Sequence, residues 1–247
     1  MIKISFARRI RGLLKGLLWR RLHGQLPVRF TRIATLLRDV LREDGEWIFV
    51  DVGAHNGRFS EAFLRVFPNM RCVCLEPLSE CVEEIRNSPW AAGRSKLINA
   101  AAGRQPGTLT LHVSSVAEAS SLLKMADAHR EWYPSARETE GREVEVITLD
   151  SLEIHDCNLI LKLDVQGMEG EVLRGATTLL QSVSACIVEV NLELLYEGQA
   201  RFSEIVALLE RAGLRFSEAT SFLYDSRDPM PLSADMIFLR KDMLRKN

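Results

Sequence analysis

The sequence predicts an α/β protein built on a doubly wound sheet of seven strands, mostly parallel with an antiparallel last strand, and preceded by a helical extension. From residue 47 onward, short runs of apolar and β-branched residues alternate with segments of helical periodicity. Such alternation is typical of a parallel sheet with helices on both faces. Near the C-terminus, two strand-like runs are joined by a short link without a helix, so these two are expected to be antiparallel.

The order of the elements can be followed along the chain. The expected helices cover residues 58–68, 78–88, 169–182 and 202–213, with Pro68 and Gly213 as stop signals. The expected strands centre on Val50, Val73, Leu97, Leu161, Ile187, Arg215 and Ile237. This order is the architecture of class I S-adenosylmethionine (SAM) methyltransferases, although a fold alone does not establish a function.

Residues 107–149 interrupt the alternation. Residues 107–114 and 141–149 both alternate with a period of two, which predicts two further strands, as a hairpin pair on the edge of the sheet. Residues 115–140 between them show no strand pattern and are long enough for a functional loop with a short helix. Within this loop, we expect Arg130, Trp132 and Tyr133 to contribute to an acceptor pocket.

Composition separates the first 45 residues from the rest. The chain has 247 residues and a net charge of -1, yet residues 1–30 hold eight Lys or Arg and no acid. We therefore expect a basic helical extension over 1–45 and one domain over 46–247. Hydrophobic residues make up 47% of the chain, which is enough for a core without a metal or disulfide. Five cysteines, an odd number without zinc-site spacing, favour a reducing compartment and a cytoplasmic location.

Residues 2–22 of the extension have the pattern of a basic amphipathic helix. Such a helix can pack on the domain with its charges in water, or lie on an anionic membrane surface at the periphery. An organellar transit peptide is a third alternative. The acidic remainder of the chain argues against nucleic acid as a partner. Oligomeric state stays open.

A glycine-containing turn follows the first expected strand. The pattern is D-x-G-x-x-x-G over Asp51, Gly53 and Gly57, rather than the G-x-G-x-x-G typical of dinucleotide sites. A carboxylate repels a pyrophosphate but suits a cation, and SAM carries a sulfonium and an ammonium group without a phosphate. Glu76 ends the second expected strand, where a carboxylate can accept hydrogen bonds from ribose hydroxyls. These residues together predict a SAM site.

A second informative stretch runs from the fourth strand into a helix. Asp164 ends that strand, and Gly167 permits a sharp exit of the chain. Glu169 begins the helix, where a negative charge also suits the helix dipole. Lys162 lies within the strand and would be either functional or part of a structural ion pair.

These motifs together resemble the FkbM family of SAM-dependent O-methyltransferases over roughly residues 47 to 240. The matching segments are FVDVGAHNGRFS, LEP, INAAAG, SSL, ITLDSL, LKLDVQGMEGEVLRGA and VEVN. The family usually has K-x-D-x-E-G-x-E on the fourth strand, and here Gln166 replaces the first glutamate. The resemblance implies methyl transfer to a hydroxyl of a sugar, glycan or natural product. It also implies SAM contacts from Asp51, Gly53, Asn56, Gly57, Glu76, Asn99, Ala100 and Ser121.

Candidate catalytic residues are Asp164 and Glu169. Methyl transfer needs alignment of the acceptor oxygen with the methyl carbon, and a positioned base can accept the hydroxyl proton. Asp164 is the first candidate base, although it could instead hold the amino group of SAM. Glu189, His55 and His129 are further candidates.

Three alternatives remain open. No resident metal is expected, although Asp164, Glu169 and Glu189 could hold a divalent cation through oxygen ligands. An NAD(P)-dependent Rossmann oxidoreductase is the neighbouring class of enzyme. A methyltransferase-like protein that binds a partner without catalysis is the third.

Overall fold

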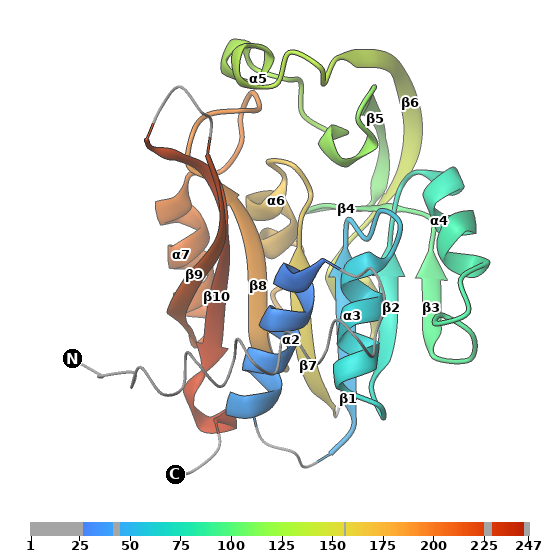
Figure 1. Ribbon diagram of the computed structural model, residues 1–247, viewed down its shortest axis with the longest axis vertical. Coiled ribbons are helices and arrows are strands. Elements are labelled where there is room, and N and C mark those ends of the chain that lie inside the picture. The colour runs from blue at the N-terminus through green and yellow to red at the C-terminus, as the bar shows by residue number, and fades with distance from the viewer. Residues whose placement is uncertain (1–26, 42–44, 156, 225–228, 245–247) are drawn as a thin grey trace.

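The computed structural model describes residues 27–41, 45–155, 157–224 and 229–244. Within them, seven strands form one sheet in the order β3-β2-β1-β7-β8-β10-β9 (Figure 1). The strands are β1 (Trp47–Val52), β2 (Arg71–Leu75), β3 (Ser95–Ile98), β7 (Asn158–Leu163), β8 (Val183–Asn191), β9 (Leu214–Tyr224) and β10 (Pro231–Arg240). Only β10 runs antiparallel to its neighbours, β8 and β9. The predicted fold class is therefore confirmed, with one expected strand at each of these seven places.

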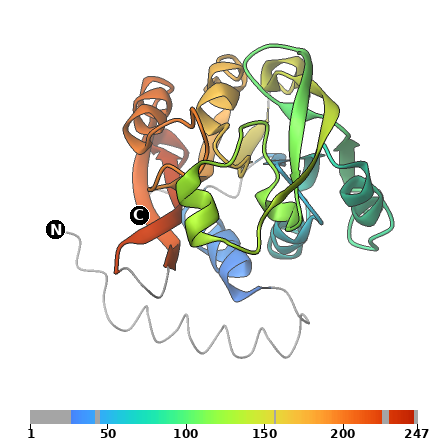
Figure 2. The same cartoon turned by 90° about the horizontal axis from the view of Figure 1, so that it is seen from above.

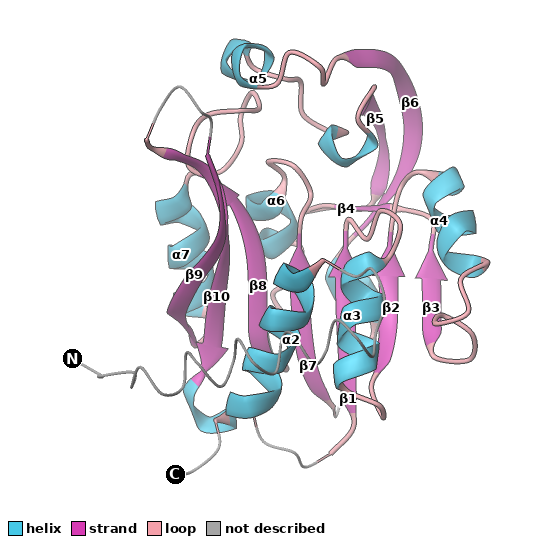
Figure 3. Cartoon of the chain, viewed as in Figure 1, coloured by secondary structure: helices cyan, strands magenta, loops and turns pink. Residues whose placement is uncertain are grey.

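Helices cover both faces of the sheet (Figures 1 and 3). One face carries α2 (Val28–Val40) and α3 (Arg58–Val66), the other carries α6 (Glu169–Arg174) and α7 (Phe202–Arg211), and α4 (Ser79–Arg86) lies beside β3. The single helix predicted over 169–182 is wrong, because α6 ends at Arg174 and only a 3-10 turn, Leu179–Gln181, follows. Gly175 explains the break: a Cβ there would lie 2.1 Å from the carbonyl oxygen of Gly103, so the chain passes another backbone at this point.

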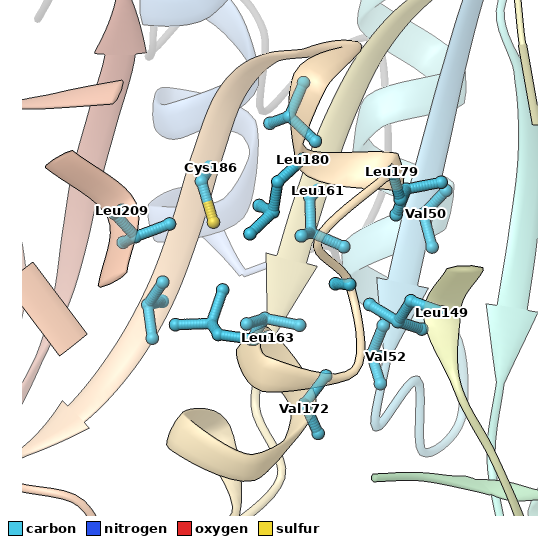
Figure 4. Close-up of a cluster of buried hydrophobic side chains, with 14 of the residues drawn as sticks. Val50, Val52, Leu149, Leu161, Leu163, Val172, Leu179, Leu180, Cys186 and Leu209 are labelled. Atoms are coloured by element: carbon cyan, nitrogen blue, oxygen red, sulfur yellow. The ribbon is translucent and has the colours of Figure 1, made fainter. Parts of the chain in front are cut away.

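Side chains of the central strands alternate between two apolar layers. Phe49 of β1 packs toward α3, where its ring stacks on Phe63 at 4.2 Å between centroids. The neighbouring Val50 faces the opposite layer with Val172 of α6 and Leu209 of α7 (Figure 4). This period of two decides which side chains near the strand ends share a face.

The inserted segment forms a separate small sheet above the carboxyl ends of the main strands (Figures 1 and 2). Its strands are β4 (Ala101–Ala102), β5 (Gly107–Ser114) and β6 (Glu138–Ile147), in the order β4-β6-β5. The antiparallel pairing of β5 with β6 was expected, but their placement on the edge of the main sheet is wrong. The two residues of β4 follow β3 in the chain and pair with Val146 and Ile147 of β6. Because of this pairing, β6 belongs to the small sheet and does not extend the edge of the main sheet at β3. Between β5 and β6 lies the expected short helix, α5 (Asp127–Trp132).

The described part of the N-terminal extension packs on the domain. Ile33, Ala34 and Leu37 of α2 are buried in the same apolar layer as the rings of α3, and Phe30 contacts Phe59 at 4.7 Å between ring centroids. The basic helix expected over residues 2–22 lies outside the described residues. No helix of the described chain is long and apolar enough to cross a membrane.

Candidate active site

The turn after β1 is shaped by two glycines with left-handed backbone conformations. Gly53 has φ 75°, and a Cβ at this position would lie 1.9 Å from the carbonyl oxygen of Asp164. Gly57 has φ 72°, and a Cβ there would lie 2.4 Å from the indole ring of Trp90. The absence of a side chain at Gly53 therefore lets the turn after β1 lie directly against the turn after β7. Two strand ends of the sheet thus form one continuous wall.

Glu76 lies at the end of β2 and is fixed by backbone amides. Its side-chain oxygens accept hydrogen bonds from the N–H of His55 at 2.8 Å and of Leu78 at 3.0 Å. The residue is only 5% exposed, and this burial raises the pKa of its carboxyl group in spite of the two amides. Each carboxylate oxygen retains a lone pair for a further donor. Asn99 supports the arrangement from outside, because its amide donates to the carbonyl oxygens of Glu76 and Pro77.

A cavity that is open to solvent lies between these turns and the small sheet. It is lined by Val52, Gly53, His55, Leu75, Glu76, Pro77, Ala100, Ala101, Ala102, Leu111, Ala117, Glu118, Ser120, Ser121, Leu122, Asp164, Val165, Gln166 and Met168. Among the predicted site residues, the structure brings together Gly53, Glu76, Ala100, Ser121 and Asp164 at this cavity. The others that were predicted, namely Asp51, Asn56, Gly57, Asn99 and Glu169, are not part of the lining.

The charges around the cavity have one sign. Glu76, Glu118 and Asp164 contribute carboxylates, and no Lys or Arg occurs among the described residues of the lining. His55 lies 3.7 Å from Glu118, measured from its Nδ1 to the carboxylate oxygen. Apolar surface comes from Leu75, the three alanines of residues 100–102 and Leu122. This combination suits a cationic ligand with hydroxyls and a flat apolar portion, and it disfavours a diphosphate.

Asp51 supports the cavity from beneath and is fully buried at 0% exposure. Ser60 of α3 donates a hydrogen bond of 2.7 Å to Oδ2, and Nζ of Lys162 lies 3.3 Å from Oδ1. Asp51 and Lys162 are partners in the register of β1 and β7, with side chains on the α2 and α3 face. Asp51, the predicted acid of the glycine motif, thus contacts Ser60 and Lys162 and is not part of the cavity lining.

Lys162 forms a buried ion pair with two carboxylates. Its ammonium lies 3.3 Å from Asp51 and 3.3 Å from Asp164, and it stands 5.1 Å above the ring of Phe59. Burial alone would lower the pKa of Lys162, but the surrounding carboxylates, which include Asp235 of β10 and Glu189 of β8, raise it overall. Of the two alternatives for Lys162, the structural ion pair is the one observed.

Asp164 reaches the cavity while its charge is stabilised from behind. Its side chain is 33% exposed, with Oδ2 3.3 Å from Lys162 and Oδ1 accepting a hydrogen bond of 2.8 Å from Gln166. Burial would raise the pKa of this carboxyl, but Lys162 and hydrogen bonds from Glu189 and Gln166 lower it overall. Conversely, the charge of Asp164 and burial raise the pKa of Glu189 well above its usual value. In this pair the surroundings therefore favour the negative charge on Asp164 over one on Glu189.

Glu169 faces the backbone of the turn that carries Asp164. One of its oxygens accepts hydrogen bonds from the N–H of Val165 at 3.0 Å and of Gly167 at 3.3 Å. Burial raises the pKa of Glu169 to about 7. The turn it supports contains two left-handed residues in succession, Gln166 at φ 53° and Gly167 at φ 98°. Its geometry fits a structural support of the turn better than contact with a substrate.

The inserted segment contacts the same turn. Ser121 donates a hydrogen bond of 2.6 Å to the carbonyl oxygen of Gln166 and accepts one from the N–H of Leu123. Arg130 is exposed and pairs with Asp127 of its own helix, and neither Trp132 nor Tyr133 lines the cavity. His129 also lies away from the cavity, buried against Tyr196. Within the described chain, no group of three or more His, Cys, Asp or Glu side chains is placed to hold a metal ion.

Sequence reasoning missed two contributors to the site. Glu118 lines the cavity but belongs to a segment without a recognisable pattern. Tyr196 donates a hydrogen bond of 2.8 Å to the side chain of Gln166 from the loop after β8. Gln166 itself had a signal, since it departs from the usual motif at a cavity-lining position.

Comparisons with known proteins agree with this geometry. Residues 51–216 match the model of the FkbM methyltransferase domain. The chain is 26% identical over 218 residues to the 2-O-methyltransferase NoeI of Sinorhizobium fredii, covering 83% of this chain and 85% of that protein.

Two solved structures are similar at lower identity. The mitomycin 7-O-methyltransferase MmcR is 16% identical with a TM-score of 0.43, over 96% of this chain and 58% of its own. TrmK of M. capricolum in complex with S-adenosyl-homocysteine is 9% identical with a TM-score of 0.46, over 88% and 70%. Because both TM-scores are below 0.5, the fold assignment depends on the strand order described above. The family match covers more than half of the sequence and confirms the resemblance seen in its motifs; the chain belongs to the FkbM methyltransferase domain family, and the protein is a methyltransferase.

Proposed function

We propose that the protein transfers the methyl group of SAM to a hydroxyl of a sugar, glycan or natural-product acceptor. The observation that carries this proposal is the cavity beside the Gly53 turn, which has carboxylates and apolar surface but no cationic side chain among its described lining residues. A sulfonium compound with a ribose fits these walls, whereas a dinucleotide would meet Glu76, Glu118 and Asp164 without a compensating Lys or Arg. The relative named a 2-O-methyltransferase supports oxygen as the acceptor atom.

The residues present fit SAM as follows. The Glu76 carboxylate has free lone pairs toward the cavity and would accept hydrogen bonds from the ribose hydroxyls. Leu75 and Ala100–Ala102 supply apolar surface for the adenine. Glu118 and Asp164 bring negative charge for the cationic part. When bound, SAM supplies an activated methyl group, so the tasks left to the chain are alignment and proton removal.

Asp164 is the side chain best placed to accept the proton that the acceptor hydroxyl loses. Its pKa is lowered by Lys162 and by hydrogen bonds, it lines the cavity, and it lies on a turn held by Glu169 and Ser121. A positioned base of this kind contributes typically about 10²–10⁴-fold to a rate. The alternative role for Asp164 is a hydrogen bond to the amino group of the cofactor.

The test separates these two roles. The full chain and its Asp164→Asn variant are titrated with SAM by calorimetry and then assayed for transfer of a labelled methyl group to a panel of sugars and glycans. We expect turnover to fall at least about 100-fold with SAM affinity within about twofold of the wild type. Asp242→Asn, at an exposed position far from the cavity, is the matched control. Equal losses of affinity and turnover would assign Asp164 to cofactor binding, and unchanged turnover would refute its role.

A further inference from the structure

A chain of hydrogen bonds connects the inserted segment to the carboxylates behind the cavity. Nε2 of His129, on α5, lies 3.3 Å from the hydroxyl of Tyr196, and that hydroxyl donates to Oε1 of Gln166 at 2.8 Å. Nε2 of Gln166 then donates to Oδ1 of Asp164 at 2.8 Å and to Oε2 of Glu189 at 3.0 Å. This series of hydrogen bonds therefore connects α5, the loop after β8, the turn after β7 and the end of β8.

The donors and acceptors in this chain fix the orientation of the Gln166 amide. Its two N–H groups are used by two carboxylates, and its oxygen is used by the Tyr196 hydroxyl. The flipped amide would direct its oxygen at Asp164 and Glu189 and its N–H groups at a hydroxyl hydrogen. Every hydrogen-bonding site of the amide except one oxygen lone pair is therefore occupied.

Tyr196 is itself held in place. The residue is 1% exposed, and its ring packs on His129 at 5.1 Å between centroids. Because a phenol has one hydrogen, donation to Gln166 leaves its oxygen to accept from His129. Burial lowers the pKa of His129, which favours the neutral ring, and donation to the Tyr196 oxygen then requires that the proton is on Nε2. The carbonyl oxygen of Ala119 lies 3.2 Å from the hydroxyl as a second acceptor.

We propose that Gln166 and Tyr196 are positioning residues that orient Asp164 beside Glu189 and stabilise its negative charge through hydrogen bonds. This inference rests on the proposed function, in which Asp164 accepts the hydroxyl proton. Two adjacent carboxylates repel, so one of them tends to take up a proton, and the one that receives the stronger hydrogen-bond donors stays ionised. The Gln166 amide supplies such a donor to Asp164 and at the same time limits how Glu189 can turn.

A glutamine at position 166 suits this role in the present chain. Glutamate has nearly the same shape but no N–H donor, so it would place a third carboxyl group between Asp164 and Glu189 and remove both hydrogen bonds. The charged and titratable groups facing Asp164 from the neighbouring elements are Asp51, Lys162, Glu169, Glu189, Tyr196 and Asp235. Lys162 is the cation in this set, and Gln166 is the neutral donor that complements it.

The test is a carbon-13 NMR titration of the full chain labelled at the side-chain carboxyls of aspartate. The Asp164 resonance is identified by its loss in Asp164→Asn. In the wild type, we expect it to remain that of an ionised carboxylate from pH 8 down to pH 4. Gln166→Leu and Gln166→Glu are expected to raise its midpoint by about one to two pH units, because a hydrogen bond to a charge is lost. Tyr196→Phe is expected to give a smaller shift in the same direction, and Tyr224→Phe, on an exposed residue of β9, none.

The outcomes separate this inference from the proposed function. An unshifted Asp164 midpoint in Tyr196→Phe and both Gln166 variants, with the rest of the spectrum intact, would overturn the positioning role even if Asp164→Asn abolishes turnover. If Asp164→Asn retains turnover while the midpoints shift as expected, the positioning role stands and the proposed base is wrong. Should the Gln166 variants fail to fold, Tyr196→Phe still tests the positioning role, because it removes only the hydroxyl that donates to Gln166. A shift of equal size in Tyr224→Phe would also overturn the inference.

Discussion

Replacement of Lys162 by methionine removes the cation between Asp51 and Asp164 while keeping an unbranched apolar side chain. The ammonium lies 3.3 Å from each carboxylate and is 5% exposed, and Asp51 is fully buried, so bulk water cannot replace Lys162 as the partner of Asp51. Loss of one partner from a buried ion pair costs about 3–5 kcal/mol, because a charge is left uncompensated. For a chain of this length, that free energy corresponds to a decrease in Tm of about 10 °C.

The effect of this substitution should depend on pH. In the wild type, the pKa of Asp164 is lower in the folded state than in the unfolded state. Its contribution to stability is therefore present above the unfolded-state pKa and is lost as pH falls through the folded-state pKa. Without Lys162, burial dominates and raises this pKa above the unfolded value. Asp164 then destabilises the fold as pH rises toward 7 and becomes neutral at acidic pH. The difference in unfolding free energy between Lys162→Met and the wild type is therefore expected to be larger at pH 7 than at pH 4.

Urea unfolding at pH 7 and pH 4 measures both quantities. Lys96→Met, on an exposed residue of β3, is the matched control and is expected to change the unfolding free energy by less than about 0.5 kcal/mol. A loss at pH 7 in Lys162→Met no larger than in this control would show that the ion pair contributes nothing to the fold. A difference that grows toward pH 4 would contradict the electrostatic explanation.

Three further predictions concern the turns and the extension. Gly53→Ala should abolish SAM binding in calorimetry and lower the unfolding free energy by about 1–3 kcal/mol through backbone strain alone. The control Gly107→Ala should change neither quantity, because no atom lies within 4 Å of the added Cβ. Normal SAM affinity in Gly53→Ala would be inconsistent with the close contact to Asp164. Because the pKa of Glu169 is raised to about 7, the contribution of this residue to stability is present below about pH 4.5 and is lost as pH rises through 7. Between pH 5 and pH 8, the unfolding free energy of Glu169→Gln, measured in urea, should therefore fall by about 2 kcal/mol less than that of the wild type. An equal fall in both proteins would contradict this prediction. Deletion of residues 2–22 should abolish sedimentation with anionic vesicles, and continued sedimentation would rule out that segment as the membrane contact.

The sequence was sufficient to predict the main sheet because each of its strands carries a local signal. β1 and β7 are short apolar runs that end in Asp51–Gly53 and Asp164–Gly167, and such boundaries depend on nearby residues. The split of the predicted helix at Gly175 could not be predicted, because it results from contact with the backbone of Gly103, 72 positions away. The small sheet was misplaced for a similar reason, since the pairing of β4 with β6 depends on two alanines without a strand pattern.

The candidate site was only partly accessible to sequence reasoning. Glu76 and Asp164 were placed at the cavity because parallel strands end at the same edge of a sheet. Asp51 and Glu169 were expected to contact ligands, yet the structure pairs them with Lys162 and with backbone amides, and pairing of this kind has no signature in the residue order. Tyr196 enters through a loop contact 30 residues from Gln166, which no local pattern reveals.

Calorimetric titration of the full chain with SAM and, separately, with NAD⁺ tests most directly whether the cavity is built for a sulfonium donor. We expect one SAM site, no heat from NAD⁺, and a loss of SAM affinity of about 1.5–3 kcal/mol, or roughly 10- to 150-fold, in Glu76→Ala, because a charged acceptor of hydrogen bonds is removed. Binding of NAD⁺ without SAM, or full SAM affinity in Glu76→Ala, would contradict this assignment of the cavity.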